Sequence, residues 1–164
     1  FGKIGSAVAK IALAFGMKVK AYSPNTRTFD GVGTVEFTDL DDVIRNSDVI
    51  SLHCPLTETT NGLVNIDFLK KMKKSAFIIN TSRGPVINEN DLRKALDEGI
   101  ISGAGVDVLS TEPPKADNPL LSSEKCIITP HIAWASFEAR TRLMNIFKEN
   151  VAAFLKGNPV NLVN

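Results

Sequence analysis

Three side chains with distinct chemistry follow predicted strands in the second half of the sequence. Arg83 lies in the stretch TSRG, Glu112 in STEPP and His131 in PHIAWAS. A guanidinium fork can bind a carboxylate through two parallel hydrogen bonds. An imidazole beside a carboxylate can give or take a proton near neutral pH. Each residue alone is ordinary, since a surface arginine, a loop acid or a structural histidine is the commoner interpretation. Only the set is informative.

The opening residues, 1–27, predict a glycine-rich turn that runs into a helix and then a strand. Gly2 and Gly5 fit the second and third glycines of the G-x-G-x-x-G dinucleotide fingerprint, whose first glycine would precede Phe1. Gly2 would let the backbone approach a pyrophosphate, which the N–H groups of Gly2, Lys3 and Ile4 and the helix dipole would hold. Ordinary turn glycines are the alternative interpretation. Because the first strand would also precede Phe1, we expect the sequence to belong to a longer protein.

Ser23, at the end of the next predicted strand, concerns the choice of cofactor. Folds specific for NAD usually place an acidic residue there, to bind the ribose 2′-hydroxyl. Ser23 carries no charge that would repel a 2′-phosphate, and Thr26 and Arg27 could bind one. The residues therefore favour NADP, whereas the nearby Asp30 keeps NAD open. The alternative is that these residues form a solvated loop whose arginine has no role in cofactor binding.

Helix and strand patterns alternate along the whole chain. In the first helix, Ala7, Val8, Ile11, Ala12 and Phe15 suit close packing on a sheet, and Gly16 can end it. The alternation predicts an α/β fold, a Rossmann-type doubly wound parallel sheet without its first strand. Further strands are expected at 17–22, 48–55, 75–82, 101–109 and 126–131. Further helices are expected after a capping box at 38–41 and at 65–74, 88–99 and 136–156.

Four stretches, at 53–65, 79–92, 103–114 and 129–136, each follow a predicted strand and so belong at the ligand-binding edge of the sheet. In these stretches the chain resembles the D-isomer-specific 2-hydroxyacid dehydrogenases, and it does so over its whole length. The resemblance implies a nicotinamide cofactor, NADP or NAD, and hydride transfer between it and a D-2-hydroxy acid or 2-keto acid, with no metal. It also implies that residues 1–156 form the NAD(P)-binding domain and that 157–164 begin the return toward a substrate domain outside the sequence.

The same resemblance implies roles for single residues. Arg83 would orient the substrate, His131 would act as the acid–base and Glu112 would be the carboxylate partner of His131. Asp107 would hold the nicotinamide carboxamide. The remaining expected cofactor contacts are Cys54, Pro55, Thr60, Thr81, Ser82 and Ala133, beside Arg83 and His131. Cys54 is not expected to be a nucleophile, and His53 is expected to be structural.

Within the family, PHIAWAS followed by EARTRL is most similar to glycerate dehydrogenases, also called hydroxypyruvate reductases. Hydroxypyruvate or glyoxylate is then the expected keto acid. Phosphoglycerate, formate or lactate chemistry in the same family stays open, and so does a non-catalytic nucleotide-sensing protein on the same fold. A homodimer is expected from the resemblance.

The composition argues against a nucleic-acid-binding, membrane-bound or metal-binding protein. The 164 residues carry a net charge of +1, so no broad basic field indicates nucleic acid. No apolar run approaches the ~20 residues that span a bilayer, so no membrane partner is expected. Cys54 and Cys126 lack metal-like spacing and are expected to be reduced thiols in a cytoplasmic protein.

Overall fold

The computed structural model describes residues 1–25 and 28–163 and divides into two compact units, residues 1–130 and residues 131–164. Thr26 and Arg27, the two residues expected to bind a 2′-phosphate, lie outside the described residues. Within the described ranges no helix is both long and apolar enough to cross a membrane.

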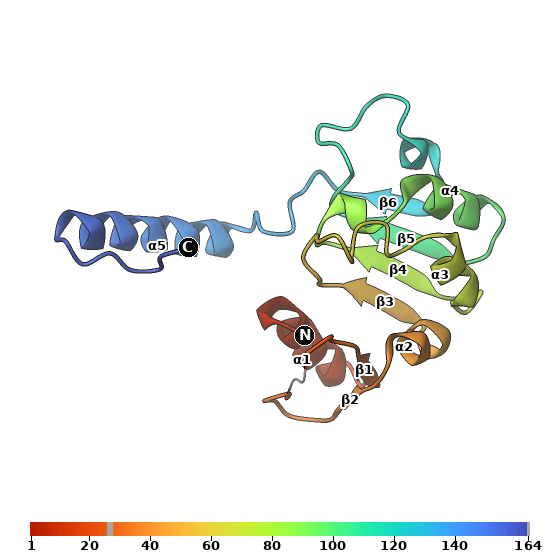
Figure 1. Ribbon diagram of the computed structural model, residues 1–164, viewed down its shortest axis with the longest axis horizontal. Helices are drawn as coiled ribbons and strands as arrows, with labels where there is room; N and C mark the ends of the chain where they lie inside the picture. The colour runs from red at the N-terminus through yellow and green to blue at the C-terminus, as the bar shows by residue number, and fades with distance from the viewer. Residues whose placement is uncertain (26–27, 164) are drawn as a thin grey trace. The chain divides into compact units, whose positions relative to one another are not determined.

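The first unit holds two parallel sheets (Figure 1). Strands β1 (Val19–Ala21) and β2 (Val35–Phe37) form one pair. The other sheet has the order β3–β4–β5–β6, formed by Val49–Leu52, Phe77–Asn80, Gly103–Val106 and Cys126–Ile128. Every strand pair is parallel, which confirms the predicted sheet type. The sequence patterns missed the three-residue strand β2.

The helices of this unit are α1 (Lys3–Ala14), α2 (Leu40–Asn46), α3 (Ile66–Lys71) and α4 (Glu89–Asp97), with the 3-10 turns η1 (Gly84–Val86) and η2 (Pro119–Ser122). Helices α2, α3 and α4 begin at polar side-chain caps, whereas α1 begins after Gly2 without one. Asn65 caps α3 and Asn88 caps α4 through their side-chain oxygens. The cap of α2 is Asp39, which accepts the N–H of Asp42, one residue later than in the predicted capping box. Neither 3-10 turn was predicted.

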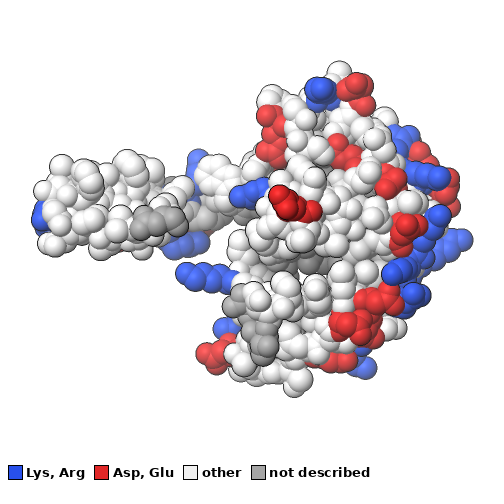
Figure 2. All heavy atoms as spheres, in the orientation of Figure 1, with Lys and Arg blue, Asp and Glu red and all other residues white. Residues whose placement is uncertain are grey.

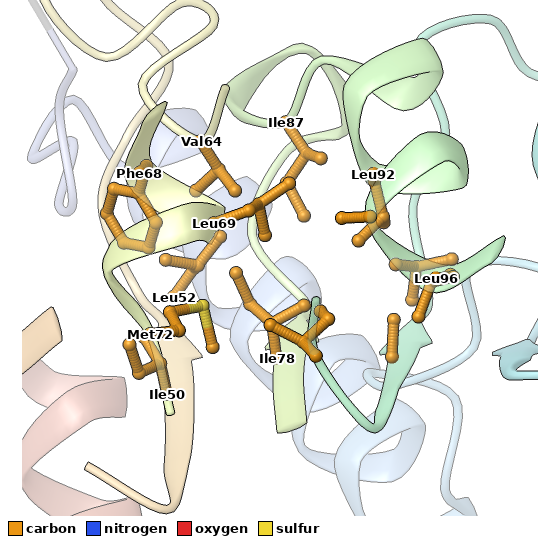
Figure 3. Packing of buried hydrophobic residues seen from close by; sticks show 14 of the residues in the cluster. Ile50, Leu52, Val64, Phe68, Leu69, Met72, Ile78, Ile87, Leu92 and Leu96 are labelled. Carbon is orange, nitrogen blue, oxygen red and sulfur yellow. The ribbon is translucent and has the colours of Figure 1, made fainter. Parts of the chain in front are cut away.

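The main core lies between β3–β6 and the helices α2–α4. Figure 3 shows apolar side chains of α3 and α4 directed toward those of β3 and β4. Leu69, Ile78, Leu92 and Leu96 are fully buried there. Because their removal from water strongly favours the folded state, this core gives β4, β5 and α4 fixed positions. These three elements carry the candidate site.

Helix α1 differs from its expected packing. Gly5 and Ala9 are its buried residues, whereas Val8, Ile11 and Phe15 are exposed. Gly5 and Ala9 therefore make the close contact. The expected packing was wrong for the larger residues and for Ala7, which is also exposed, whereas Ala12 is partly buried. Gly16 has a φ of +78° and follows the last helical turn, which confirms its predicted role in ending the helix.

The second unit is a loop followed by α5 (Phe137–Leu155). Ser136 accepts the N–H of Ala139 and begins the helix where the sequence predicts it. None of the residues of α5 is buried.

Candidate active site

The candidate site of the first unit lies where β4 and β5 end. Because the two strands are parallel neighbours, the residues that follow them meet at one edge of the sheet (Figure 1). The backbone N–H of Asp107, the residue after β5, donates to the carbonyl oxygen of Asn80, the last residue of β4, at 2.9 Å. The loop with Thr81–Arg83 and the loop with Glu112 therefore start side by side.

Asn80 fixes the turn that presents Arg83. Its side chain is 1% exposed. Its Oδ1 accepts the backbone N–H of Ser82 at 3.0 Å and the Ser82 hydroxyl at 2.8 Å, and its Nδ2 donates to the Arg83 carbonyl oxygen at 2.9 Å. A buried amide with all these partners holds a turn rigidly. Asn80 was not predicted, although a polar residue at the end of an apolar strand was a signal.

Arg83 directs its polar end away from the core. The residue is exposed, and Nη1 donates to the carbonyl oxygen of Ser82 at 2.6 Å. Among the residues that the structure describes, no carboxylate lies within 4.0 Å of its guanidinium. The salt-bridge alternative for Arg83 therefore finds no support here, and its fork can receive an anionic ligand.

Asp107 is a buried carboxylate held between two strands. It is 5% exposed, and the Thr129 hydroxyl donates to Oδ1 at 2.5 Å. Thr129 is itself fixed, because its backbone N–H donates to the Val106 carbonyl oxygen at 3.0 Å. Such a carboxylate presents a fixed acceptor at the sheet edge. Thr129 was not predicted, and the residue type alone gave no signal.

Glu112 lies farther along the same loop. Its Oε1 accepts the backbone N–H of Leu109 at 3.1 Å, which turns the side chain back toward the end of β5. The residue is exposed. The structure therefore brings Arg83, Asp107 and Glu112 to one edge, as the sequence predicts.

The loop after β3 folds on itself. The Thr60 hydroxyl donates to the Pro55 carbonyl oxygen at 2.6 Å and accepts the Thr57 N–H at 2.8 Å. Cys54 is half-buried, and burial raises the pKa of its thiol. A raised pKa agrees with the prediction that Cys54 is not a nucleophile.

His53 packs against the first helix. A β-carbon on Gly5 would lie 3.6 Å from the His53 ring, and the Ser51 hydroxyl lies 3.0 Å from its Nε2. Burial lowers the pKa of His53, so the ring favours its neutral form. These contacts agree with the structural role expected for this residue.

The first turn of a helix has backbone N–H groups with no partner within the helix, and α1 begins directly after Gly2. Gly2 is the N-cap, and a β-carbon there would meet nothing within 4 Å. Lys3 and Ile4 form the exposed first turn. The Ser23 hydroxyl lies 3.0 Å from the Phe1 nitrogen, so the residues that follow β1 lie beside this turn. The open space at Gly2 fits the approach of a phosphate.

His131 and Ala133 belong to the second unit. His131 has a φ of +52°, a left-handed conformation that is uncommon for a residue with a side chain. Its carbonyl oxygen accepts the indole N–H of Trp134 at 2.9 Å. Their placement beside the residues of the first unit stays a prediction.

Residues 1–133 match the family model described as "D-isomer specific 2-hydroxyacid dehydrogenase, NAD binding domain". A hydroxypyruvate reductase of Blautia hydrogenotrophica is 51% identical over 164 residues, which cover 100% of this chain and 51% of that protein. The chain spans about half the length of the curated relatives that it matches.

Two solved structures resemble the fold closely. A D-isomer specific 2-hydroxyacid dehydrogenase from Lactobacillus delbrueckii ssp. bulgaricus, in its NAD complexed form, has a TM-score of 0.87 and 34% identity, covering 99% of this chain and 53% of that chain. An acyclic imino acid reductase in complex with NADPH and D-Arg has a TM-score of 0.89 and 37% identity, covering 99% and 51%.

Proposed function

The chain belongs to the D-isomer specific 2-hydroxyacid dehydrogenase family, and from that premise we propose that its protein reduces a 2-keto acid to the D-2-hydroxy acid with a nicotinamide cofactor. The observation that carries the proposal is that the turn with Arg83 and the loop with Glu112 meet at the carboxyl ends of β4 and β5. Residues 1–156 are proposed as the cofactor-binding domain, and a homodimer is proposed as the assembly.

The proposed roles of the catalytic residues follow from their chemistry. Arg83 binds the substrate carboxylate with its fork and polarises the 2-keto oxygen. His131 donates a proton to that oxygen during reduction and takes it back during oxidation. Glu112 favours the imidazolium form of His131 by its negative charge. This proposal requires His131 to come within hydrogen-bonding reach of Glu112.

The residues of the first unit suit a nicotinamide dinucleotide. The N–H groups of the first turn of α1, beside the open space at Gly2, would hold its phosphates. The Asp107 carboxylate, fixed by Thr129, would accept a hydrogen bond from the carboxamide. The loop with Cys54, Pro55 and Thr60 would pass the adenosine. When bound, the nicotinamide supplies or accepts the hydride.

We propose NADP as the preferred form. Ser23 lies beside the start of α1 and carries no negative charge, so it would not repel a 2′-phosphate. Thr26 and Arg27 remain proposed ligands of that phosphate. The proposed substrate is hydroxypyruvate or glyoxylate, which the likeness to a hydroxypyruvate reductase supports.

The test follows the absorbance of the reduced cofactor in the protein at its natural length. Hydroxypyruvate and glyoxylate are each supplied with NADPH and with NADH. We expect oxidation of the cofactor, faster with NADPH. We expect Arg83→Gln to raise the KM for the keto acid and to lower kcat. The matched control is Arg45→Gln, because Arg45 pairs with Asp41 on the exposed surface of α2, away from the sheet edge.

Faster oxidation with NADH would contradict the NADP proposal and leave the enzyme proposal standing. Failure to oxidise either cofactor with hydroxypyruvate, glyoxylate or the alternative keto acids would contradict the enzyme proposal. Normal kinetics in the Arg83→Gln protein would contradict the role of Arg83.

A further inference from the structure

The residues that carry Glu112 are fastened to α4 by a glutamate that the proposed reaction does not use. We call residues 110–118 the Glu112 loop. Glu89, the first residue of α4, accepts the Ser110 backbone N–H with Oε1 at 2.7 Å. It accepts the Asn118 side-chain amide with Oε2 at 2.9 Å. The two oxygens of one carboxylate therefore hold both ends of the Glu112 loop.

Each of these contacts is fixed in its direction. A backbone N–H is always a donor, so the Ser110 contact needs an acceptor at position 89. Asn118 Oδ1 accepts the N–H of Leu120 at 3.0 Å and thereby begins η2, so its Nδ2 must face Glu89. A carboxylate that accepts two such hydrogen bonds holds them more strongly than a neutral group would. The site is therefore built for a charged double acceptor.

The base of this contact is rigid. Leu92, Ala95 and Leu96 of α4 are fully buried in the main core, and α4 packs beside η2 (Figure 1). The first turn of a helix also favours a negative charge. Glu89 is thus a fixed point on the core side, whereas Ser110 and Glu112 are exposed. On the face shown in Figure 2, acidic and basic side chains of the first unit are interspersed.

We propose that Glu89 is a positioning residue, which holds the Glu112 loop so that Glu112 can act on the catalytic acid–base. The inference rests on the proposed function. Glu89 acts through Glu112 and touches neither substrate nor cofactor. Its loss lets the loop shift, and a displacement of about 1 Å can reduce a rate roughly 100-fold.

A double-mutant cycle in the protein at its natural length tests this role. The kcat for hydroxypyruvate is measured for Glu89→Ala, Glu112→Gln and the double variant. We expect Glu89→Ala to lower kcat about 10- to 100-fold, with a nearly unchanged KM for the cofactor. In the Glu112→Gln protein the same substitution should lower kcat less than about twofold, because residues that act as one unit are not additive.

A matched control comes from the same turn of α4. Asp91 also accepts a backbone N–H from another segment, that of Ile66 at 2.9 Å, and it lies away from the Glu112 loop. Asp91→Ala should reduce stability, with the same effect on kcat whether position 112 is Glu or Gln. If Glu89→Ala behaves in this additive way, Glu89 is only structural and the inference is overturned.

An exchange of donor and acceptor provides the second test. Glu89→Gln places an amide against the Asn118 amide, and Asn118→Asp places a carboxylate against the Glu89 carboxylate. Either change alone should lower kcat, whereas the double variant can restore both hydrogen bonds and should recover most of kcat. If the kcat of the double variant does not exceed that of the better single variant, the role of the Asn118 contact is overturned. The proposal that Glu89 holds both ends of the Glu112 loop is then overturned with it.

Amide hydrogen exchange gives a readout that needs no activity. Peptides covering residues 109–118 should exchange faster in Glu89→Ala than in Asp91→Ala, and unchanged exchange would overturn the inference. An inactive wild-type protein would overturn the proposed function, and the positioning role with it. Normal wild-type activity with an additive cycle would overturn the positioning role alone.

Discussion

Gly84 lies so close to Leu109 that a β-carbon at position 84 would come within 2.0 Å of the Leu109 carbonyl carbon. This contact joins the turn that presents Arg83 to the loop that leads to Glu112. A side chain cannot be admitted there without a shift of backbone atoms. Packing therefore requires glycine at position 84. Backbone conformation does not, since the φ of Gly84 is not in the left-handed region.

Gly84→Ala should destabilise the protein by about 1–3 kcal/mol or more, since an overpacked contact against backbone cannot relax by side-chain rotation. The free energy of unfolding in urea measures this effect. Gly105→Ala is the control, because its β-carbon would meet the flexible end of Ile79 at 3.1 Å. Equal losses in the two variants would contradict the prediction.

Asn80→Ala should raise the KM for the keto acid about tenfold, because the turn before Arg83 loses three hydrogen bonds. It should also lower the free energy of unfolding by about 1–3 kcal/mol. Asn65→Ala is a matched control, since Asn65 accepts two backbone N–H groups as the cap of α3. That variant should lose stability and keep its KM. A KM raised equally in both would speak against a local role for Asn80.

Ser23→Asp should lower the preference for NADPH over NADH about tenfold or more, because a carboxylate there would repel a 2′-phosphate and accept a ribose hydroxyl. The ratio of kcat/KM for the two cofactors is the measurement. Ser75→Asp is the control, because Ser75 is exposed and precedes β4 at the opposite edge of the sheet. An unchanged ratio in Ser23→Asp would show that another position selects the cofactor.

Cys126 should react slowly with iodoacetamide near neutral pH. Burial, with a smaller effect from the negative charge of Glu89, raises the pKa of its thiol to about 11. The raised pKa keeps the thiol neutral, so its thiolate fraction at pH 8 is roughly 100-fold below that of an unperturbed thiol. Measured by mass spectrometry on the peptide that contains Cys126, the rate of alkylation should rise about tenfold per pH unit between pH 8 and 10. A plateau that begins below pH 9 would contradict the raised pKa.

Most of the fold was predictable because its signals are local. The apolar strands β3 to β6 and the caps of α3, α4 and α5 lie where the sequence indicates them. The strand β2 was missed because three residues hold no readable period. Val8 and Ile11 of α1 and the following Phe15 are exposed, so an apolar pattern indicates only a preference for burial, and the surface that a helix meets also matters.

The candidate site divides in the same way. The placement of Arg83, Asp107 and Glu112 at one edge of the sheet could be predicted because each lies in a motif that follows a strand. Thr129 and Glu89 could not, because their roles depend on partners that only folding brings near. Asn80 was missed although its partners Ser82 and Arg83 are close in sequence. Thr129 meets Asp107 across 22 positions, and Glu89 meets Asn118 across 29.

The sequence by itself determined the order of the α-helices and of every strand except β2, the family, and the candidate residues with suitable chemistry, because periodicity, caps and motifs are properties of neighbouring residues. Tertiary structure decided which of those residues are held still. The parallel pairing of β4 with β5 brings Asn80 to Asp107, and the packing of α4 sets Glu89 against the Glu112 loop. Hydrogen bonds between distant segments form only once a buried core has fixed the distance between them.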